Sequence, residues 1–338
     1  MNVLDRSAAR YDGAIVATLT GVVDRLRQRG EPLALEPADR LDGRTCLCTG
    51  ATRGLGLAIA HGLAARGARL ILACRSGGEA ARADVARSAT RSDDVRTLPL
   101  DLGDFATVER ALNDLRSSGA ALDVAVLNAG IVPREARRTV DGLDESFQVN
   151  FLANAFFARA LIDRGVLRAA STERRPRMVV VSSESHRSAP PIDWTAAGVY
   201  RPWGIREAVE QYGHGKLLLQ TFTEELARRH AGSVAVHSLC PGAVRTDIGR
   251  EAPAWVKPAL ALTMRAFFQA PERAALPVLY LAAARELEGQ TGVYLHGKRR
   301  RTPSEMATHP ESGRAAWRTV EDLVSSSGYT MGPESDER

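Results

Sequence analysis

The feature that most constrains this chain is a regular alternation between short apolar runs and longer stretches with helical periodicity. The runs that read as buried strands cover 45–50, 69–74, 95–100, 123–130, 177–183 and 234–242. Helical patterns lie between them, over 55–66, 104–117, 141–169 and 212–230. Strands that alternate with helices of this length are typical of a doubly wound parallel sheet, and their continuous apolar character fits burial on both faces. We therefore predict an α/β, Rossmann-type fold with helices on both faces of the sheet.

A glycine-rich segment, TGATRGLG at 49–56, lies where the first strand passes into a helix. Gly50, Gly54 and Gly56 allow a tight turn and let a pyrophosphate approach the backbone and the positive end of the helix. A purely structural turn is the simpler alternative. Its position in the first strand–helix unit favours a dinucleotide site, because ligands of such sheets bind at the carboxyl ends of the strands.

Two arginines indicate which dinucleotide to expect. Arg53 lies inside the loop, and Arg75 ends the second strand in LACR. An acid at the second position would hold a ribose 2′-hydroxyl, whereas an arginine accommodates a 2′-phosphate through a charge-assisted contact. We therefore expect NADP(H) rather than NAD(H); a pair of solvated surface arginines is the alternative.

Further candidates follow the third and fourth strands. Asp101, with Leu102 behind it, is placed to hydrogen-bond the adenine amine, to cap the next helix, or both. Asn128, Ala129 and Gly130 form a run of mostly small residues where we expect the backbone to come close to the cofactor.

Tyr212 and Lys216 are separated by Gly213, His214 and Gly215 near the predicted start of a helix. Residues four apart share a helix face, so the phenol and the amine point into the same cleft. A phenol with a pKa near about 10 is a poor acid or base at neutral pH, and a nearby cation lowers that pKa. Each interior glycine costs roughly 1 kcal/mol relative to alanine, so we expect both to leave room for cofactor or backbone. A chance pairing of the two side chains is the alternative.

In chain order, these motifs resemble the short-chain dehydrogenase/reductase family over residues 44–300. The matching segments are TGxxxGxG at 49–56, Asp101, NAG at 128–130, Asn150, Ser183, Tyr212 with Lys216, and PGAVRTD at 241–247. LACR, LNAG, VVVSSESH and AAWRTVEDLV are most similar to the retinol-dehydrogenase-like and protochlorophyllide-reductase-like branch.

The resemblance implies a role for each catalytic candidate. Tyr212 would give a proton to the substrate oxygen or take one from it, and Ser183 would hydrogen-bond that oxygen. Lys216 would lower the pKa of Tyr212 and hold the nicotinamide ribose, and Asn150 would hold a water in a proton relay through Lys216. Hydride would pass between the nicotinamide and a carbonyl carbon. Ser183 is preferred to Ser182 because it lies three residues before the position that His186 occupies here.

The resemblance also implies the cofactor contacts, and it implies no metal. They are Gly50, Thr52, Arg53, Gly54, Leu55, Gly56, Arg75, Asp101, Leu102, Asn128, Ala129, Gly130, Tyr212, Lys216, Pro241, Gly242, Val244 and Thr246.

The chain departs from the family pattern in ways that remove no catalytic group. Gly215 precedes the lysine where the family usually has serine, and Leu127 replaces the first asparagine of NNAG. His214 is an unusual neighbour, which we expect to face solvent or a partner.

Aromatic residues concentrate in two insertions, which we predict to form a substrate lid over 187–211 and 247–275. They are Trp194, Tyr200 and Trp203 in the first, and Trp255, Phe267 and Phe268, with Met264, in the second. Such a lid favours a bulky apolar ketone or aldehyde and its alcohol, with ordinary loop packing as the alternative. A carboxylate clamp is not evident, although Arg187, Arg201 and Arg206 could serve as one. The alternative functions are reduction of a C=C bond on the same fold and a non-catalytic NADP-binding regulatory role.

Composition sets the remaining expectations. The chain has 338 residues, 44% hydrophobic and 25% charged, with a net charge of +5. These values fit a globular oxidoreductase that binds a small hydrophobic substrate and do not require nucleic acid. We predict an N-terminal helical extension with an amphipathic helix over 1–40, one NADP-binding domain over 41–325 and a polar tail over 326–338. The chain shows no signal-peptide pattern or membrane span, so we expect a cytoplasmic protein that could form a homo-oligomer.

Overall fold

The computed structural model describes residues 35–119, 121–168, 174–244 and 269–332. The predicted N-terminal amphipathic helix and most of the second lid segment lie outside these ranges. The described residues form an eight-stranded sheet in the order β3-β2-β1-β4-β5-β6-β7-β8. The strands are β1 (Thr45–Thr49), β2 (Arg69–Cys74), β3 (Val95–Pro99), β4 (Val124–Leu127), β5 (Arg177–Val181), β6 (Ala235–Cys240), β7 (Tyr294–His296) and β8 (Arg299–Arg300). All pairs are parallel except that of β7 with β8.

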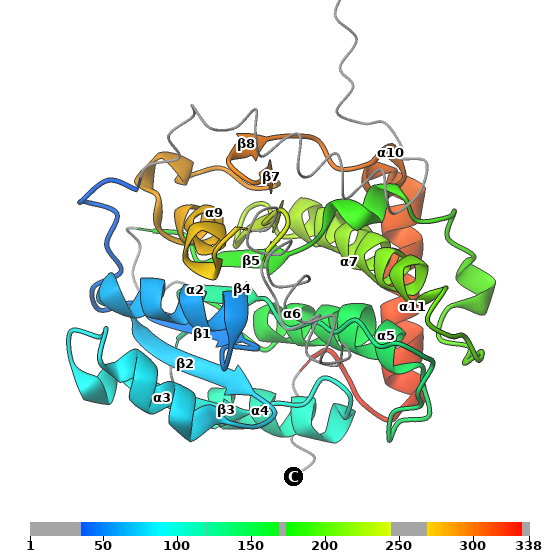
Figure 1. Cartoon of the computed structure of the whole chain (residues 1–338), viewed down its shortest axis with the longest axis horizontal. Coiled ribbons are helices and arrows are strands. Elements are labelled where there is room, and N and C mark those ends of the chain that lie inside the picture. The colour runs from blue at the N-terminus through cyan, green and yellow to red at the C-terminus, as the bar shows by residue number, and fades with distance from the viewer. Residues whose placement is uncertain (1–34, 120, 169–173, 245–268, 333–338) are drawn as a thin grey trace, which may run out of the picture.

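Helices cover both faces of this sheet (Figure 1). One apolar core joins the sheet to α2 (Gly54–Ala65), α3 (Gly78–Ala86) and α9 (Pro271–Ala283). A second core joins the other face to α4 (Phe105–Ser117), α6 (Ala153–Asp163) and α7 (Ala208–Arg229). The predicted doubly wound, Rossmann-type fold is therefore confirmed, and burial on both faces explains why the strands are apolar without alternation.

The C-terminal helix α11 (Pro310–Ser326) packs outside the second layer, against α7 and α6 (Figure 1). Its Trp317 stacks on Phe222 of α7 with ring centroids 5.5 Å apart. The guanidinium carbons of Arg159 and Arg229 lie 4.0 and 4.2 Å from the centre of the same indole. Stacking and cation–π contacts thus fix α11 to the helix that carries Tyr212.

Short elements complete the described chain. They are α5 (Glu145–Phe147), α10 (Glu305–Thr308), the π-helical turn η4 (Gln148–Leu152), and the 3₁₀ turns η3 (Ser92–Asp94), η5 (Glu184–Arg187), η6 (Trp194–Ala196) and η8 (Arg285–Leu287).

Two helix predictions need correction. The stretch 141–169 is not one long helix, because η4 interrupts it and α6 ends at Asp163. Asn154 stabilises the wide turn by donating hydrogen bonds to the carbonyls of Val149 and Ala129, at 2.7 and 3.2 Å. The helix of Tyr212 begins at Ala208, so the tyrosine lies in its second turn rather than at its start.

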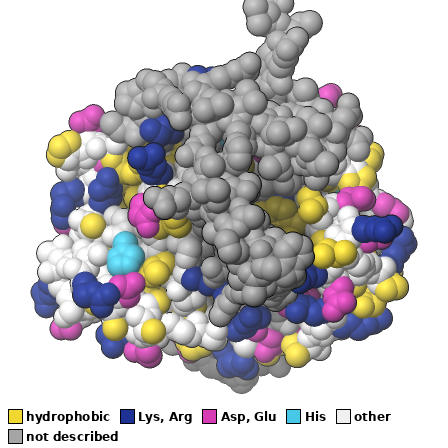
Figure 2. All heavy atoms as spheres, in the orientation of Figure 1, with side chains coloured by type: hydrophobic (Ala, Val, Ile, Leu, Met, Phe, Trp, Pro, Cys, Tyr) yellow, Lys and Arg dark blue, Asp and Glu magenta, His cyan; other side chains and the backbone are white. Residues whose placement is uncertain are grey.

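The surface mixes charges of both signs, as Figure 2 shows for the described part of one face. The exposed large hydrophobic residues come from the segments on either side of the predicted substrate site: Val132, Val140, Val199, Ile205 and Val209. Within the described ranges, no helix has the length and apolar character needed to cross a membrane.

Candidate active site

The glycine-rich turn after β1 packs directly against the turn after β4. Gly50 has φ of +66°, and a Cβ on it would lie 3.1 Å from the Cα of Ala129. A Cβ on Gly56 would collide with the carbonyl of Gly50. The hydroxyl of Thr49 accepts hydrogen bonds from the backbone N–H groups of Asn128 and Ala129, both at 3.0 Å. Only glycine at these positions lets the two turns meet, as the sequence predicted for Gly50 and Gly56.

The start of α2 can receive an anion. The helix begins at Gly54, which is exposed and has φ of +51°. Arg53 takes the N-cap position without a side-chain cap, and the first turn carries no acid. The first backbone N–H groups of a helix lack partners within it, so they can bind a phosphate. Thr52 and Leu55, the other candidates here, are half-buried.

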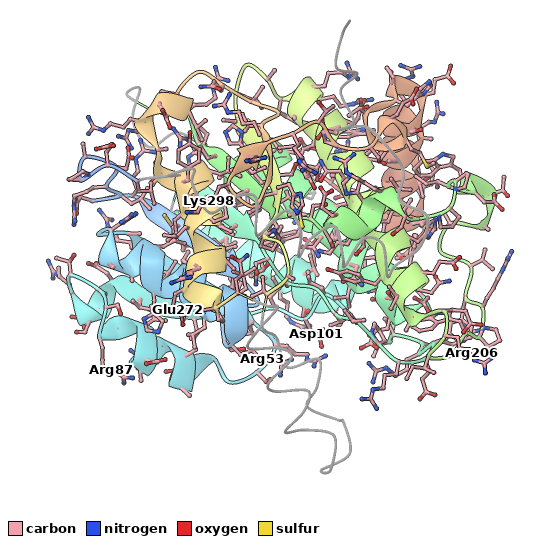
Figure 3. The ribbon with its side chains drawn as sticks, turned by 45° about the horizontal axis from the view of Figure 1, so that its top comes forward. Arg53, Arg87, Asp101, Arg206, Glu272 and Lys298 are labelled. Atoms are coloured by element: carbon pink, nitrogen blue, oxygen red, sulfur yellow. The ribbon has the colours of Figure 1, made fainter. Side chains whose placement is uncertain are left out.

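Arg53, Arg75 and Asp101 come from three different strand ends. Arg53 and Asp101 lie along one edge of the molecule in Figure 3. Arg75 is exposed, with Nε 4.0 Å from a carboxylate oxygen of Asp101. The carboxylate of Asp101 accepts a hydrogen bond from the N–H of Gly103 at 2.9 Å. Its suggested role as a helix cap is wrong, because Asp104 caps α4.

The other predicted cofactor contacts are spread over three turns. Leu102 is buried in the core next to Asp101. Pro241 and Val244 are buried, and Gly242 has φ of +83° in the turn after β6. Thr246 lies outside the described residues.

Asn150 ties the π-helical turn to the loop after β4. Its amide oxygen accepts a hydrogen bond from the N–H of Ile131, and its amide nitrogen donates to the carbonyl of Ile131, both at 2.9 Å. The amide nitrogen also donates to the hydroxyl of Ser146 at 3.1 Å. Both amide hydrogens therefore have protein partners, so a relay water could bond this side chain only at its oxygen.

Gly130 lies against both Asn150 and Lys216. A Cβ on Gly130 would lie 3.0 Å from the side-chain oxygen of Asn150 and 3.5 Å from Nζ of Lys216. The glycine is exposed, and a side chain there would crowd these two polar groups, so its absence leaves the backbone bare beside the amine. A planar ring can approach the backbone there, which fits a nicotinamide.

Ser183 follows β5 and lies next to Tyr212. The Ser183 hydroxyl accepts a hydrogen bond from the N–H of Ser185 at 3.2 Å and donates to its hydroxyl at 3.1 Å. Burial raises the pKa of the Tyr212 phenol to about 12, and a hydrogen bond with Ser183 acts in the opposite direction. Ser182 is buried and makes no such contact with the phenol. The preference for Ser183 over Ser182 therefore agrees with the geometry.

Lys216 is buried on the same face of α7 as Tyr212. Its Nζ donates to the carbonyl of Val181 at 2.9 Å and lies 5.8 Å from the centre of the Tyr212 ring. Burial lowers the pKa of Lys216 to about 8. The expected lowering of the Tyr212 pKa by Lys216 is not found in the chain alone, because burial dominates and the amine is directed at a backbone carbonyl.

The glycines between these residues serve helix packing. A Cβ on Gly213 would lie 2.9 Å from the carbonyl oxygen of Ser185, and one on Gly215 would lie 3.0 Å from Cβ of Asn150. Gly213 therefore makes room for the backbone of η5, and Gly215 makes room for the π-helical turn η4. Room for backbone was one of the two expected reasons for these glycines, and room for the cofactor was the other. His214 between them is half-buried.

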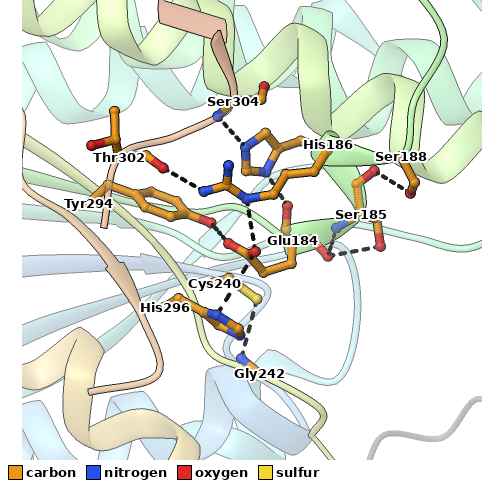
Figure 4. A network of polar contacts seen from close by, with 12 residues as sticks. Glu184, Ser185, His186, Ser188, Cys240, Gly242, Tyr294, His296, Thr302 and Ser304 are labelled. Atoms are coloured by element: carbon orange, nitrogen blue, oxygen red, sulfur yellow. Dashed lines mark hydrogen bonds and ion pairs between the residues drawn. The ribbon is translucent and has the colours of Figure 1, made fainter. Parts of the chain in front are cut away.

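The turn η5 contains a buried polar network that sequence reasoning missed (Figure 4). The carboxylate of Glu184 accepts hydrogen bonds from the Tyr294 hydroxyl at 2.7 Å and from Nε of Arg187 at 2.9 Å, and His296 lies 3.9 Å away. Burial acts to raise the pKa of Glu184, but His296 and Arg187 outweigh it and lower the pKa to about 2. The only sequence signal was an acid placed directly beside Ser183 in an apolar stretch.

His186 links this turn to the C-terminal segment. One ring nitrogen lies 2.6 Å from the carbonyl of Ser183, and the other accepts a hydrogen bond from the N–H of Ser304 at 3.0 Å. The ring is therefore neutral and donates to Ser183, in agreement with its pKa, which burial lowers to about 4. The carbonyl of the serine proposed to bind substrate is thus held by His186, whose ring is fixed by the segment that follows β8.

The arginines suggested as a carboxylate clamp do not form one. Arg187 is buried on Glu184 and donates to the carbonyl of Thr302. Arg206 is exposed and far from Arg53 and Asp101 in Figure 3, and Arg201 is exposed as well.

The aromatic residues of the first lid segment pack on the loop before α5. The Trp203 indole donates to the carboxylate of Asp144 at 2.9 Å, and the Arg138 guanidinium lies 4.1 Å from the centre of the Tyr200 ring. Trp194 is half-buried. Trp255, Phe267, Phe268 and Met264 of the second segment lie outside the described residues.

Comparison with known proteins identifies the family. The short chain dehydrogenase model matches residues 44–194. Retinol dehydrogenase 13 of Mus musculus is 31% identical over 320 residues, which cover 92% of each chain. The WW domain-containing oxidoreductase of Drosophila melanogaster is 33% identical over 296 residues, covering 84% of this chain and 69% of that protein.

Solved structures agree. The Pseudomonas aeruginosa RhlG/NADP active-site complex matches with a TM-score of 0.56 and 26% identity, covering 78% of this chain and 98% of that one. A Mycobacterium paratuberculosis protein matches with a TM-score of 0.64 and 27% identity, covering 84% and 94%. The chain belongs to the short-chain dehydrogenase/reductase family and is an oxidoreductase of that class.

The Glu184 network predicts a pH-dependent stability difference. Because the folded-state pKa of Glu184 lies below its ordinary value of 4.5, the carboxylate stabilises the fold above that pH, and this contribution is lost as the pH falls toward 2. Glu184→Gln should lower the free energy of unfolding by about 3 kcal/mol at pH 7, and by clearly less at pH 3.

Urea unfolding at both pH values measures this difference. Glu79→Gln is the matched control, since Glu79 pairs with Arg82 on the exposed surface and should contribute less than about 1 kcal/mol. An unchanged cost of Glu184→Gln at the two pH values would contradict the assignment.

Proposed function

We propose that this chain is an NADP(H)-dependent oxidoreductase that interconverts a bulky apolar ketone or aldehyde and its alcohol, with Tyr212 as the acid and base. The observation that carries the proposal is the meeting of Ser183, Tyr212 and Lys216 beside the exposed backbone of Gly130. The glycine-rich turn lies on the same edge of the sheet and supplies a phosphate site at the start of α2.

Each side chain has a chemical task in this proposal. Bound nicotinamide would supply or accept the hydride. Ser183 would donate a hydrogen bond to the substrate oxygen, and Tyr212 would exchange a proton with it. Lys216, whose amine lies beside the Gly130 position, would leave the Val181 carbonyl for the ribose hydroxyls, where its charge favours the phenolate of Tyr212.

The choice of NADP(H) rests on charge at the end of β2. Arg75 is exposed there, Arg53 caps α2 without side-chain bonds, and Arg75 is only 4.0 Å from its nearest acid. A 2′-phosphate would meet two guanidinium groups at this edge, whereas a ribose 2′-hydroxyl would find no acid at the end of β2. Solved structures of the same fold include complexes with NADP and with NAD, so the choice depends on the two arginines of this chain.

The substrate class rests on the apolar character of the first lid segment. Trp194 is half-buried, and Tyr200 and Trp203 fix that segment to the loop before α5. Retinol dehydrogenases and a polyprenol dehydrogenase are among the relatives about 31% identical to this chain, and their names denote long apolar alcohols. Product analysis separates carbonyl reduction from the alternative, reduction of a C=C bond.

Cofactor preference is tested by reversing one charge. Arg75→Asp should raise the Kd for NADPH roughly tenfold or more, because it replaces a charge-assisted contact with repulsion, and it should improve NADH relative to NADPH. Cofactor fluorescence titration measures both values. Arg87→Asp, at another exposed arginine, is the matched control and should leave them unchanged. A wild-type chain that already prefers NADH would contradict the assignment.

The catalytic proposal is tested by removing one hydroxyl. Tyr212→Phe keeps the ring and its packing, so the fold and NADPH binding should survive while kcat falls roughly 10²–10⁴-fold. NADPH absorbance with a panel of bulky aldehydes and ketones measures the rate. Lys216→Ala should be at least as damaging, and Tyr280→Phe is the matched control, since that hydroxyl donates to Glu286 and belongs to no proposed site. Near wild-type turnover by Tyr212→Phe would rule out the mechanism.

A further inference from the structure

A cavity of about 960 Å³ lies between the segment that follows Ser183 and the C-terminal elements α10 and α11. None of the residues proposed above for cofactor binding or proton transfer is among its described lining residues, whereas Arg187, Ala189 and Trp194 belong to the segment 187–211 predicted as a substrate lid. Its volume is in the range of sites that bind small organic molecules. The cavity is therefore a candidate for a second ligand site.

Two buried polar groups in its wall lack a partner. Arg187 is 2% exposed and Ser304 is 7% exposed, and both line the cavity. Among the described residues, Nη1 of Arg187 and the hydroxyl of Ser304 have no hydrogen-bond partner. Buried polar groups are nearly always paired, and an unpaired one costs about 1–3 kcal/mol. Donors left unpaired in the wall of a cavity point to a ligand that accepts hydrogen bonds.

The Arg187 guanidinium is held in a fixed orientation. Its Nε donates to Glu184 and its Nη2 to the carbonyl of Thr302, so Nη1 alone remains for a ligand. Glu184 already balances the charge of Arg187. An anionic ligand therefore needs attraction from further positive groups in the wall of the cavity.

The start of α11 supplies these cations. Arg314 and Arg318 line the cavity one helical turn apart, both exposed. His309, at the N-cap of this 17-residue helix, also lines the cavity, so the positive end of the helix borders it. Glu305 and Glu311 line the cavity too and offset the charges of Arg314 and Arg318, so an anion depends on the helix end and on the unpaired Nη1 of Arg187. Trp194 and Met306 add an apolar wall.

We propose that this cavity binds an organic anion, whose carboxylate or phosphate contacts Arg187 and Ser304 and whose apolar body packs on Trp194 and Met306. The proposal does not depend on the reaction that the chain catalyses. Figure 4 shows how close the cavity wall is to the turn η5: the backbone of Ser304 donates to the His186 ring. The other nitrogen of that ring donates to the carbonyl of Ser183. An anion held on the Ser304 side chain is thus two hydrogen bonds from the proposed catalytic serine.

Calorimetry on the full chain, saturated with NADP⁺, tests the site with three probes: octanoate, octyl phosphate and the uncharged octanamide. We expect one anion site per chain, with octanamide bound at least about tenfold more weakly because it lacks the charge-assisted bonds. Tighter octanoate would identify a carboxylate ligand, and tighter octyl phosphate a phosphate ligand. Equal binding of octanamide, binding of neither anion, or loss of anion binding when NADP⁺ is present would overturn the proposal.

Variants separate a ligand role from a structural one. Ser304→Ala removes a hydroxyl that has no partner among the described residues, so Tm should be kept while anion affinity falls about three- to tenfold. Arg318→Gln should weaken binding in the same way, and Arg116→Gln, at an exposed arginine of α4, should not. Wild-type affinity in both Ser304→Ala and Arg318→Gln would contradict the site.

Discussion

Seven parallel strands with both faces buried determine where every functional group of this chain can lie. A parallel sheet requires each crossover to return the chain to the same end, so the turns after β1, β2, β3, β4 and β5 all open at one edge. Arg53, Arg75, Asp101, Asn128 and Ser183 occupy those turns. The remaining catalytic candidates, Asn150, Tyr212 and Lys216, come from the helical layer on one face, which brings them to the same edge from the side.

Buried charged side chains flank the proposed catalytic serine at the end of β5. Lys216 bonds the carbonyl of Val181 on one side of Ser183, and Glu184 is buried on the other side with Arg187, Tyr294 and His296. Burial works against the charged forms of both Lys216 and Tyr212, with pKa values of about 8 and 12. A charge that enters the cleft should therefore change the pKa values of both groups strongly, because electrostatic interactions are stronger where water is excluded.

Much of this arrangement could be predicted from the sequence because its signals are local. Strand runs, the turn at Gly50–Gly56 and the spacing of Tyr212 and Lys216 each lie within a few residues, and the fold they predicted is confirmed. The π-helical turn at Asn150 could not be predicted, since it depends on bonds from Asn154 to distant backbone. The Glu184 network joins η5 to β7, 110 residues away, and no local pattern encodes that contact. The division into domains, the oligomeric state and the location in the cell stay predictions.

The central claim is that Tyr212 becomes an acid and base near neutral pH only when the cofactor is bound in its cleft. The pKa of its phenol, from the difference in phenolate absorbance between the wild-type chain and Tyr212→Phe, tests this directly when titrated with and without NADP⁺. We expect a pKa near 12 in the chain alone and a fall toward neutral pH with NADP⁺, because the nicotinamide cation and the Lys216 amine, which is charged below its pKa of about 8, both favour the phenolate. A pKa that stays near 12 with the cofactor bound would contradict the account.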